Sequence, residues 1–437
     1  MIVTAPNSNK KSSGLRHILF GSDRIKLLQG SCPKSIKHIA RRWFPHTYDA
    51  YCRSKWRAMD TSADAVEIST YEAKVNVRLG IIKEFAHAHK YYVGACRDMG
   101  VPYKMIDISM PGWIDTIQNS GCDAFLVRPS SEFSIWKQMY DERLRIIVED
   151  LDKIIYPTYN ELWFYESKRR MCYWLQSHAI PHPKTWVFYN CDEALDFARN
   201  TILPIVFKSD FGSSASGVRI FHSRPRLIQW IKLCFAKGIV RKNEDPRDRL
   251  WGSVLLQEHL HNAKEWRVIR LGNSYFAHQK IRKGQFHSGS GKFKWYDPPK
   301  RLLDFARDVT DKGNFTSMNL DTFETSDGRY LINELQSTFG AVCPYQMLVK
   351  GEAGRYIYDY NAKSWCFEKG IFCQNGCCNL RVKALVEKLG KHVELPQVNV
   401  DTTVSKKDKE ASINDLELYY KPLCQLNSKF HVMNKDH

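Results

Sequence analysis

Two oxygen-bearing side chains stand two residues apart in the segment YLINELQSTFG, residues 330–340. Alternate residues of a β-strand share a face, so Glu334 and Gln336 would point to one place, with Ile332 on their side and the two leucines opposite. Asp321 precedes them on a neighbouring apolar run. Mg²⁺ prefers such oxygen ligands and completes its shell with phosphate and water. The alternative is a strand whose polar side chains face solvent.

A loop of small residues lies upstream, in PIVFKSDFGSSASGVRI, residues 204–220. It contains Ser213, Ser214 and Gly217 between two apolar runs, and small residues let backbone N–H groups approach phosphate oxygens. Lys208, before the loop, would add a positive charge. The segment predicts a phosphate-binding loop that differs from the Walker type, because no GxxxxGK[ST] sequence occurs. A Ser/Gly hairpin without a ligand is the alternative.

Charged residues gather in KEWRVIRLGNSYFAHQKIRK, residues 264–283, which alternates around the turn LGNS and predicts a β-hairpin. Glu265 and Arg267 would share one face of its first strand, and Lys280 and Arg282 one face of the second. Basic rows beside a carboxylate favour an anion site. An edge strand protected by basic residues is the alternative.

The order of these features resembles the ATP-grasp superfamily, nearest to glutathione synthetases and ribosomal-protein glutamate ligases. A lysine in YESKRRM precedes the loop, and Gln-Glu in SVLLQEHL, the basic hairpin, Asp321 and the Glu-x-amide pair follow. The resemblance runs from about Val77 to about Tyr345 and depends on order and spacing. The segments NELQSTFG…PYQM and GEAGRYIYDYNAKSWCFEKG are also similar to poorly characterised ATP-grasp proteins associated with surface-polysaccharide synthesis.

The resemblance implies a role for each candidate residue, and it implies ATP and Mg²⁺ or Mn²⁺ as cofactors. Lys168 and Lys208 would contact the ATP phosphates, and Ser213, Ser214 and Gly217 would belong to a flap over them. The adenine would be contacted by Gln257, Glu258 and the backbone at His259 and Leu260, and the ribose by Glu265. The catalytic set at the acyl-phosphate is Arg267 and Lys280. The metal set is Asp321, Glu334 and Gln336. The family usually has Asn at position 336 and often Arg near His287.

The implied fold is α/β (α+β), an ATP-grasp fold behind a small parallel α/β domain and a helical N-terminal extension. Apolar strands alternating with helical patterns support the parallel domain, and a long helix is expected over residues 133–155. The predicted segments are a basic, mostly helical extension (1–75), the parallel domain (76–155), the ATP-grasp domain with two subdomains (156–345), a β-rich and helical appendage (346–395), and a charged, partly disordered tail (396–437).

The expected reaction joins a carboxylate to an amine through an acyl-phosphate, with release of ADP and phosphate. The pathway would be surface-polysaccharide or peptide-conjugate synthesis, with anionic small-molecule or saccharide substrates. Two other functions stay open. One is an ATP-grasp kinase acting on an acceptor such as an inositol phosphate; the other is a nucleotide-binding module without turnover.

Composition limits the partners. The chain has 437 residues, 65 Lys and Arg against 47 Asp and Glu, and a formal charge of +18, which favours an anionic partner. No nucleic-acid-binding motif occurs, so no specific nucleic acid is expected. No apolar run is long enough for a transmembrane segment. The basic extension, with IKHIARRWF, predicts either a solvated pair of capping helices or peripheral contact with an anionic membrane or substrate.

The thirteen cysteines favour a reduced, cytoplasmic setting, because they are scattered and no signal-peptide core accompanies them. One cluster occurs, Cys366, Cys373, Cys377 and Cys378. Its spacing contains no CxxC pair, so ordinary thiols are favoured over a zinc site.

Overall fold

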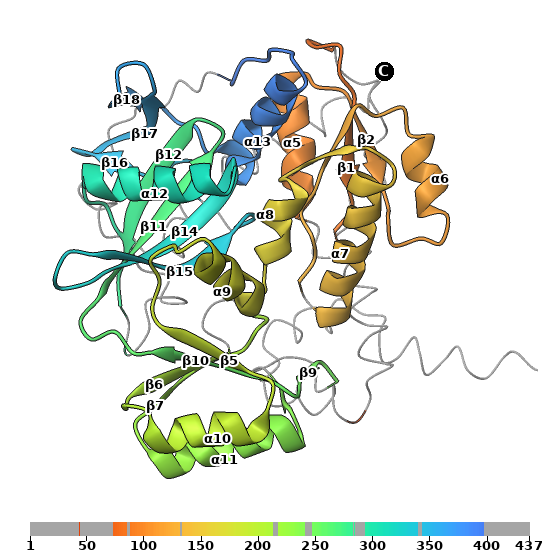
Figure 1. Ribbon diagram of the computed structural model, residues 1–437. Helices are drawn as coiled ribbons and strands as arrows, with labels where there is room; N and C mark the ends of the chain where they lie inside the picture. Colours follow the sequence, from red (N-terminus) through yellow and green to blue (C-terminus); the bar gives the residue numbers. More distant parts are fainter. Residues whose placement is uncertain are drawn as a thin grey trace, which may run out of the picture.

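The computed structural model describes residues 73–84, 88–131, 133–212, 217–240, 247–282, 293–339 and 343–396, with the single residues 43 and 284. Three sheets of four or more strands form the framework (Figure 1). We call them the parallel sheet, the small sheet and the large sheet. The predicted N-terminal extension and C-terminal tail lie almost entirely outside the described residues. Every helix within the described ranges is too short or too polar to cross a bilayer.

The parallel sheet has the strand order β2-β1-β3-β4, and all its neighbours run parallel. Its strands and helices alternate along the chain: β1 (Leu79–Ile82), α5 (Lys90–Met99), β2 (Tyr103–Ile106), α6 (Trp113–Gln118), β3 (Ala124–Leu126), α7 (Ser134–Glu149) and β4 (Ile154–Tyr156). The single long helix expected over residues 133–155 is wrong. The chain turns after α7, with Asp152 at a φ of 50°, and then adds a fourth strand.

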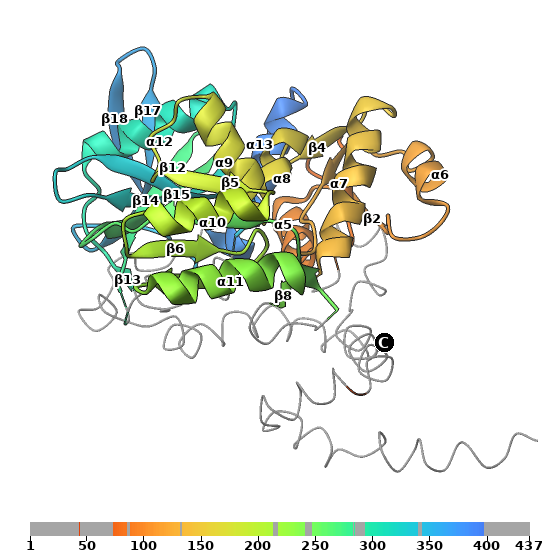
Figure 2. The ribbon, with the colours of Figure 1, turned by 60° about the horizontal axis from the view of Figure 1, so that its bottom comes forward.

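The small sheet is antiparallel in the order β5-β10-β6-β7. Its elements are β5 (Thr185–Phe188), α10 (Cys191–Asn200), β6 (Ile205–Lys208), β7 (Val218–Phe221), α11 (Arg224–Ala236) and β10 (Val254–Glu258), with the short pair β8 (Ile239–Val240) and β9 (Arg249–Leu250) beside them. Ile205, Phe207 and Leu256 pack with α10 and α11, which cover one face (Figures 1 and 2). Strand alternation therefore turns Lys208 and Gln257 to the other face.

The large sheet has the order β15-β14-β11-β12-β17-β16, with β13 paired to β12 and β18 to β17. Its strands are β11 (Lys264–Leu271), β12 (Ser274–Lys280), β13 (Phe293–Lys294), β14 (Ser317–Glu324), β15 (Tyr330–Gln336), β16 (Leu348–Val349), β17 (Glu352–Asp359) and β18 (Ser364–Lys369). Helices α9 (Lys168–Ser177) and α12 (Lys300–Lys312) cover one face through a shared apolar core. The strands of the predicted appendage thus extend this sheet.

Helix α8 (Tyr159–Phe164) joins the parallel sheet to the large sheet. Thr158 and Glu161 form a capping box at its N-terminus. One oxygen of the Glu161 carboxylate takes part in this capping box. The other oxygen accepts the backbone N–H groups of Thr316 and Ser317, both at 2.6 Å. The buried carboxylate therefore holds the start of β14, the strand that carries Asp321.

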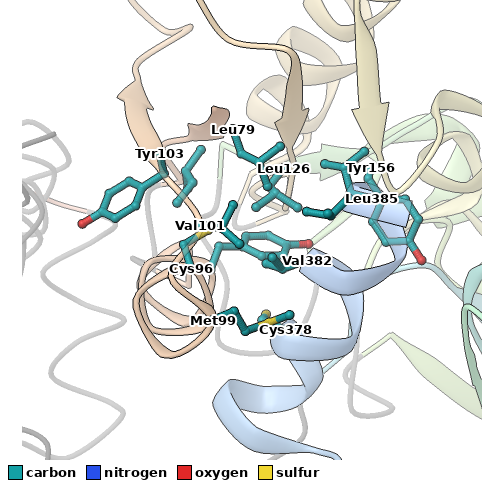
Figure 3. Packing of buried hydrophobic residues seen from close by; sticks show 14 of the residues in the cluster. Leu79, Cys96, Met99, Val101, Tyr103, Leu126, Tyr156, Cys378, Val382 and Leu385 are labelled. Atoms are coloured by element: carbon teal, nitrogen blue, oxygen red, sulfur yellow. The ribbon is translucent and has the colours of Figure 1, made fainter. Parts of the chain in front are cut away.

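Helix α13 (Gln374–Lys388) returns the chain to the parallel sheet. Its residues Cys378, Val382 and Leu385 lie in one core with Leu79 of β1 and Leu126 of β3 (Figure 3). The first turn of α13 contains three consecutive residues in the left-handed region, at positions 375–377. The C-terminal part of the described chain is consequently packed against its first sheet.

Candidate nucleotide and metal site

A β-bulge between β14 and β15 sets the direction of the acidic side chains. Asp321 is paired with Glu334, and regular pairing resumes at Ile332, so Asn333 is an extra residue on β15. An extra residue reverses the facing of the side chains beyond it. Ile332 and Leu335 therefore pack into the same core. The expectation that Ile332 shares a face with Glu334 is wrong.

Four side chains with amide or carboxylate oxygens lie on the opposite face; we call them the oxygen patch. They form two directly opposed pairs, Asn319 with Gln336 and Asp321 with Glu334, and such pairs have Cβ atoms about 4.5–5.5 Å apart. The buried Asn319 Oδ1 has no hydrogen-bond partner among the described residues. Two carboxylates with neighbouring amide oxygens fit Mg²⁺, which takes its remaining ligands from phosphate and water. The structure thus brings together the three predicted metal residues.

Asp321 is fully buried in a network of charges. Arg267 Nε donates to Asp321 Oδ1 at 3.1 Å, and the Lys280 ammonium group donates to Asp321 Oδ2. Lys280 also donates to Glu265 Oε1 at 2.8 Å. Burial alone would raise the pKa of Asp321, but Arg267 and Lys280 outweigh it and lower that pKa well below the usual range. The network keeps the carboxylate ionised and holds both predicted catalytic cations beside the oxygen patch.

Lys168, the first residue of α9, connects the oxygen patch to the loop that follows β6. Its Nζ donates to the Gly212 carbonyl at 2.7 Å and lies 3.2 Å from Glu334 Oε1. The Gly212 N–H in turn donates to Glu166 at 3.1 Å. Burial opposes the charge, yet the carboxylates of Glu334 and Glu166 outweigh it and raise the pKa of Lys168. Lys168 therefore stays charged, and it contacts Gly212, the residue that precedes the predicted flap.

Lys208 ends β6 on the face turned toward the large sheet. Its Nζ donates to Asn333 Oδ1 at 2.7 Å, so the bulge residue joins the two sheets. No carboxylate of the described residues forms an ion pair with Lys208. Burial lowers its pKa to about 8, against the opposing effect of Glu334. A bound anion would favour the charged form of this lysine.

The predicted adenine residues lie at the end of β10, next to β5. Gln257 Nε2 donates to Thr185 Oγ1 at 2.9 Å, and Glu258 Oε1 accepts the Lys184 N–H at 2.7 Å. These contacts connect β10 to β5. Leu260 lies two residues after the end of β10.

Gly217 is the last residue of the predicted flap and directly precedes β7. A Cβ atom there would lie 1.6 Å from Ser209 Oγ, so the close approach requires glycine. The Gly217 carbonyl also accepts the Ser209 N–H at 2.8 Å. Ser213, Ser214 and His287 lie outside the described residues, so the flap stays a prediction.

Sequence reasoning missed His278, Asn319 and Asn333. His278 is paired with Arg267 across the hairpin, and its Nδ1–H donates to the Gln346 carbonyl at 3.0 Å. Burial lowers its pKa to about 3 and holds it neutral. Asn319 could have been found, because it lies two residues before Asp321 on the same strand face. Nothing in the sequence marks Asn333 as a bulge residue.

The structure separates Cys366 from the other three cysteines of the cluster. Cys366 is exposed on β18, whereas Cys373, Cys377 and Cys378 are buried in or beside α13. Among the described residues, no group of three His, Cys, Asp or Glu side chains is placed to hold a metal ion. Burial raises the pKa of the Cys373 thiol well above its usual value, which favours the ordinary protonated thiol.

Comparisons with known proteins give structural neighbours only. No protein-family model matches the sequence, and a search of curated proteins gives no match. One structural neighbour is the biotin carboxylase domain of 2-oxoglutarate carboxylase from Hydrogenobacter thermophilus, in complex with MgADP, ADP and bicarbonate; the identity is 12%, the TM-score is 0.46, and the match covers 62% of this chain and 65% of that chain. A second is N5-carboxyaminoimidazole ribonucleotide synthetase from Thermotoga maritima, with 15% identity, a TM-score of 0.45, and coverage of 74% of this chain and 78% of that chain. A third is a RimK domain ATP-grasp protein from Sphaerobacter thermophilus, with 13% identity, a TM-score of 0.42, and coverage of 59% of this chain and 90% of that chain.

This chain therefore spans just under two thirds of the length of that biotin carboxylase domain. The fold follows from the architecture: a parallel α/β sheet precedes two antiparallel units, and the inner faces of those units carry Lys208 on one side and the oxygen patch on the other. This α/β architecture is the one that the sequence resemblance to ATP-grasp proteins predicts.

Proposed function

We propose that this chain is an ATP-dependent carboxylate–amine ligase. The observation that carries the proposal is the meeting of two buried lysines with the oxygen patch: Lys168 lies 3.2 Å from Glu334, and Lys208 bonds the adjacent Asn333 from a separate sheet. Two cations facing two carboxylates are the elements that phosphoryl transfer requires, namely positions for phosphate oxygens and for a divalent ion. Asp321, Glu334 and Gln336, with Asn319, would hold the ion, which neutralises charge on the phosphates when bound.

The remaining steps belong to the residues around Asp321. Lys168 and Lys208 would bind and orient the phosphates of ATP while its γ-phosphoryl group moves to the substrate carboxylate. Arg267 and Lys280, already fixed by Asp321 and Glu265, would hold positive charge where the oxyanion develops as an amine attacks the acyl-phosphate. Because these cations are held in place before the substrate arrives, their reorganisation would cost little. A protein nucleophile is not needed.

Gln257, Glu258 and Leu260 would contribute the adenine site at the end of β10, and Glu265 would contact the ribose. The flap would be residues 213–217. We further propose a cytoplasmic role in surface-polysaccharide or peptide-conjugate synthesis, supported by the sequence resemblance alone. Anionic carboxylates and small amines are the proposed substrates.

The test uses the full chain with ATP, Mg²⁺ or Mn²⁺, a panel of carboxylates, and amino acids or amino sugars. Formation of ADP and free phosphate together with an amide product would support the ligase. AMP with pyrophosphate would contradict the acyl-phosphate route, and phosphate retained on the acceptor would indicate a kinase. The matched control is Glu334→Ala, which should abolish ADP formation without lowering the melting temperature much, because Glu334 is partly exposed and outside the core.

A further inference from the structure

Arg381 of α13 is a fully buried cation for which no carboxylate of the described residues provides an ion pair. Its Nε donates to Ser317 Oγ at 3.1 Å, its Nη1 donates to the Gly376 carbonyl at 3.3 Å, and its guanidinium group lies 4.7 Å from the ring centre of Phe339. Its Nη2 is buried without a hydrogen-bond partner among the described residues. A buried charge without a counter-charge is costly, so this arrangement calls for an explanation.

A second arginine, Arg128, belongs to a loop beside the same core. Arg128, in the loop after β3, follows Val127, whose carbonyl accepts the Tyr92 hydroxyl at 3.2 Å. Tyr92 packs in one core with Cys378 and Val382, which flank Arg381 on α13. Arg128 has no hydrogen bond or ion pair with another described residue. Two like charges that share neighbours repel each other, and an oxyanion between or beside them would remove that repulsion.

Two serines lie near the arginines, because Ser130 is two residues after Arg128 and the Ser337 carbonyl accepts the Ser317 hydroxyl that Arg381 contacts. Ser130 Oγ, after β3, and Ser337 Oγ, after β15, are buried and have no hydrogen-bond partner among the described residues. Their chain neighbours meet at Tyr165, whose hydroxyl lies 3.4 Å from Ser131 Oγ and also adjoins Thr338. The loops after β3 and β15, which carry Ser130 and Ser337, therefore meet at Tyr165.

This region adjoins the oxygen patch. Ser337 directly follows Gln336, and the Ser317 hydroxyl that contacts Arg381 donates to the Ser337 carbonyl at 2.9 Å. Ser317 also lies two residues before Asn319 on β14. A small molecule with one group at the oxygen patch could thus place a second group at the arginines.

We propose that Arg381, Arg128 and the hydroxyls of Ser130 and Ser337 form an oxyanion subsite for a second anionic group of the acceptor substrate. Guanidinium groups bind carboxylate and phosphate through paired N–H donors, and serine hydroxyls donate to the same oxygens. The substrate class is therefore a dicarboxylate, or a carboxylate that also carries a phosphate. This assignment of the substrate rests on the proposed function, whereas the anion subsite itself does not.

The test measures anion binding by the full chain with Mg²⁺ and a saturating non-hydrolysable ATP analogue, so that the nucleotide site is occupied. Inorganic phosphate, succinate and glutarate are titrated separately by calorimetry, with acetate for comparison. Saturable binding of phosphate indicates a phosphate-bearing substrate, and tighter binding of a dicarboxylate than of acetate indicates a second carboxylate. Arg128→Gln should weaken this binding at least tenfold, whereas the exposed control Arg145→Gln on α7 should leave it unchanged.

Two serine variants separate binding from folding. Ser130→Ala removes an unpartnered buried hydroxyl, so it should weaken anion binding without lowering the melting temperature of the ligand-free protein. Ser120→Ala removes a buried hydroxyl that donates to the Ile117 carbonyl at 2.8 Å, so it should lower the melting temperature and leave anion binding intact. Arg381 itself connects α13 to Ser317, so its variants would combine both effects.

The subsite is overturned if none of the three anions binds saturably, or if binding survives in both Arg128→Gln and Ser130→Ala. Binding of the ATP analogue is measured first without added anion. If the ATP analogue does not bind but phosphate still binds in a way that depends on Arg128, the proposed function is contradicted and the subsite is not. If the nucleotide binds and ADP forms, but Arg128→Gln does not change the affinity for the anions, the subsite alone is contradicted.

Discussion

Two lysines that end strands on opposite sides of the candidate site, Lys208 and Lys280, have different surroundings. Lys280, on the large sheet, contacts the carboxylates of Asp321 and Glu265. Lys208, on the small sheet, donates only to the neutral amide of Asn333 among the described residues. Burial consequently lowers the pKa of Lys208 to about 8. The comparison indicates that the large sheet has its charges already paired, whereas the small sheet presents a cation to a ligand.

The largest expected effect on stability comes from Lys280→Met. The variant leaves Glu265 and Asp321 buried beside one remaining cation, Arg267. Breaking a buried ion pair on one side costs about 3–5 kcal/mol, so the free energy of unfolding should fall by roughly that amount. Urea unfolding at pH 7 measures it. The control is Lys369→Met, which breaks an exposed ion pair with Glu352 and should cost at most about 1 kcal/mol. Equal losses in the two variants would show that Lys280 is not part of a buried network.

Lys208→Met should have the opposite pattern. It removes a desolvated charge without orphaning a carboxylate, so the ligand-free protein should melt at the same or a higher temperature. Affinity for the Mg²⁺ complex of a non-hydrolysable ATP analogue should fall about 10- to 100-fold, because a charge-assisted hydrogen bond contributes about 1.5–3 kcal/mol. Calorimetric titration measures this, with the exposed Lys184→Met as control. Unchanged affinity in Lys208→Met would make the lysine structural.

The lowered pKa of Lys208 also predicts proton uptake on nucleotide binding. Its folded pKa of about 8 lies below the ordinary lysine value of 10.5. The charge therefore disfavours folding fully below pH 8, and this cost disappears as the pH rises toward 10.5. A phosphate favours the charged form, so affinity should fall by up to about tenfold per pH unit above pH 8. Titrations at pH 8.5 in buffers of different ionisation enthalpy should show uptake in the wild type but none in Lys208→Met.

The smallest expected effect is that of Gln336→Asn. The shorter side chain keeps a carboxamide oxygen, and the Gln336 side chain has no hydrogen-bond partner among the described residues, so no hydrogen bond in the described part of the chain depends on its length. Turnover should stay within about tenfold of the wild type, which corresponds to about 1.4 kcal/mol. Steady-state rates over a range of Mg²⁺ concentrations measure it. Complete loss would mean that the longer side chain is matched to this site.

Local sequence signals predicted much of the site. The turn at residues 326–328 returns the chain so that Asp321 lies opposite Glu334, and alternation correctly places Glu265 and Arg267 on one face. The bulge at Asn333 could not be predicted, because it is defined by the register between two strands. The strand after α7 was missed because it is only three residues long.

Long-range packing was also beyond the sequence. Arg381 lies 253 positions after Arg128, and no local pattern indicates that two arginines so far apart belong to segments beside the same core. Nor does periodicity show that Glu161 holds the start of β14. Both depend on where folded elements meet, which one chain's local composition does not encode.

The return of α13 to the parallel sheet has a consequence for protein synthesis. Domains generally fold as units from the N-terminus while the ribosome is still extending the chain. Here the core around Leu79 and Leu126 includes Val382 and Leu385, which are translated some 250 to 300 residues later. The first sheet to emerge must therefore wait, with an exposed apolar face, until nearly the whole described chain has left the ribosome, and nascent chains stopped before α13 should depend most on chaperones.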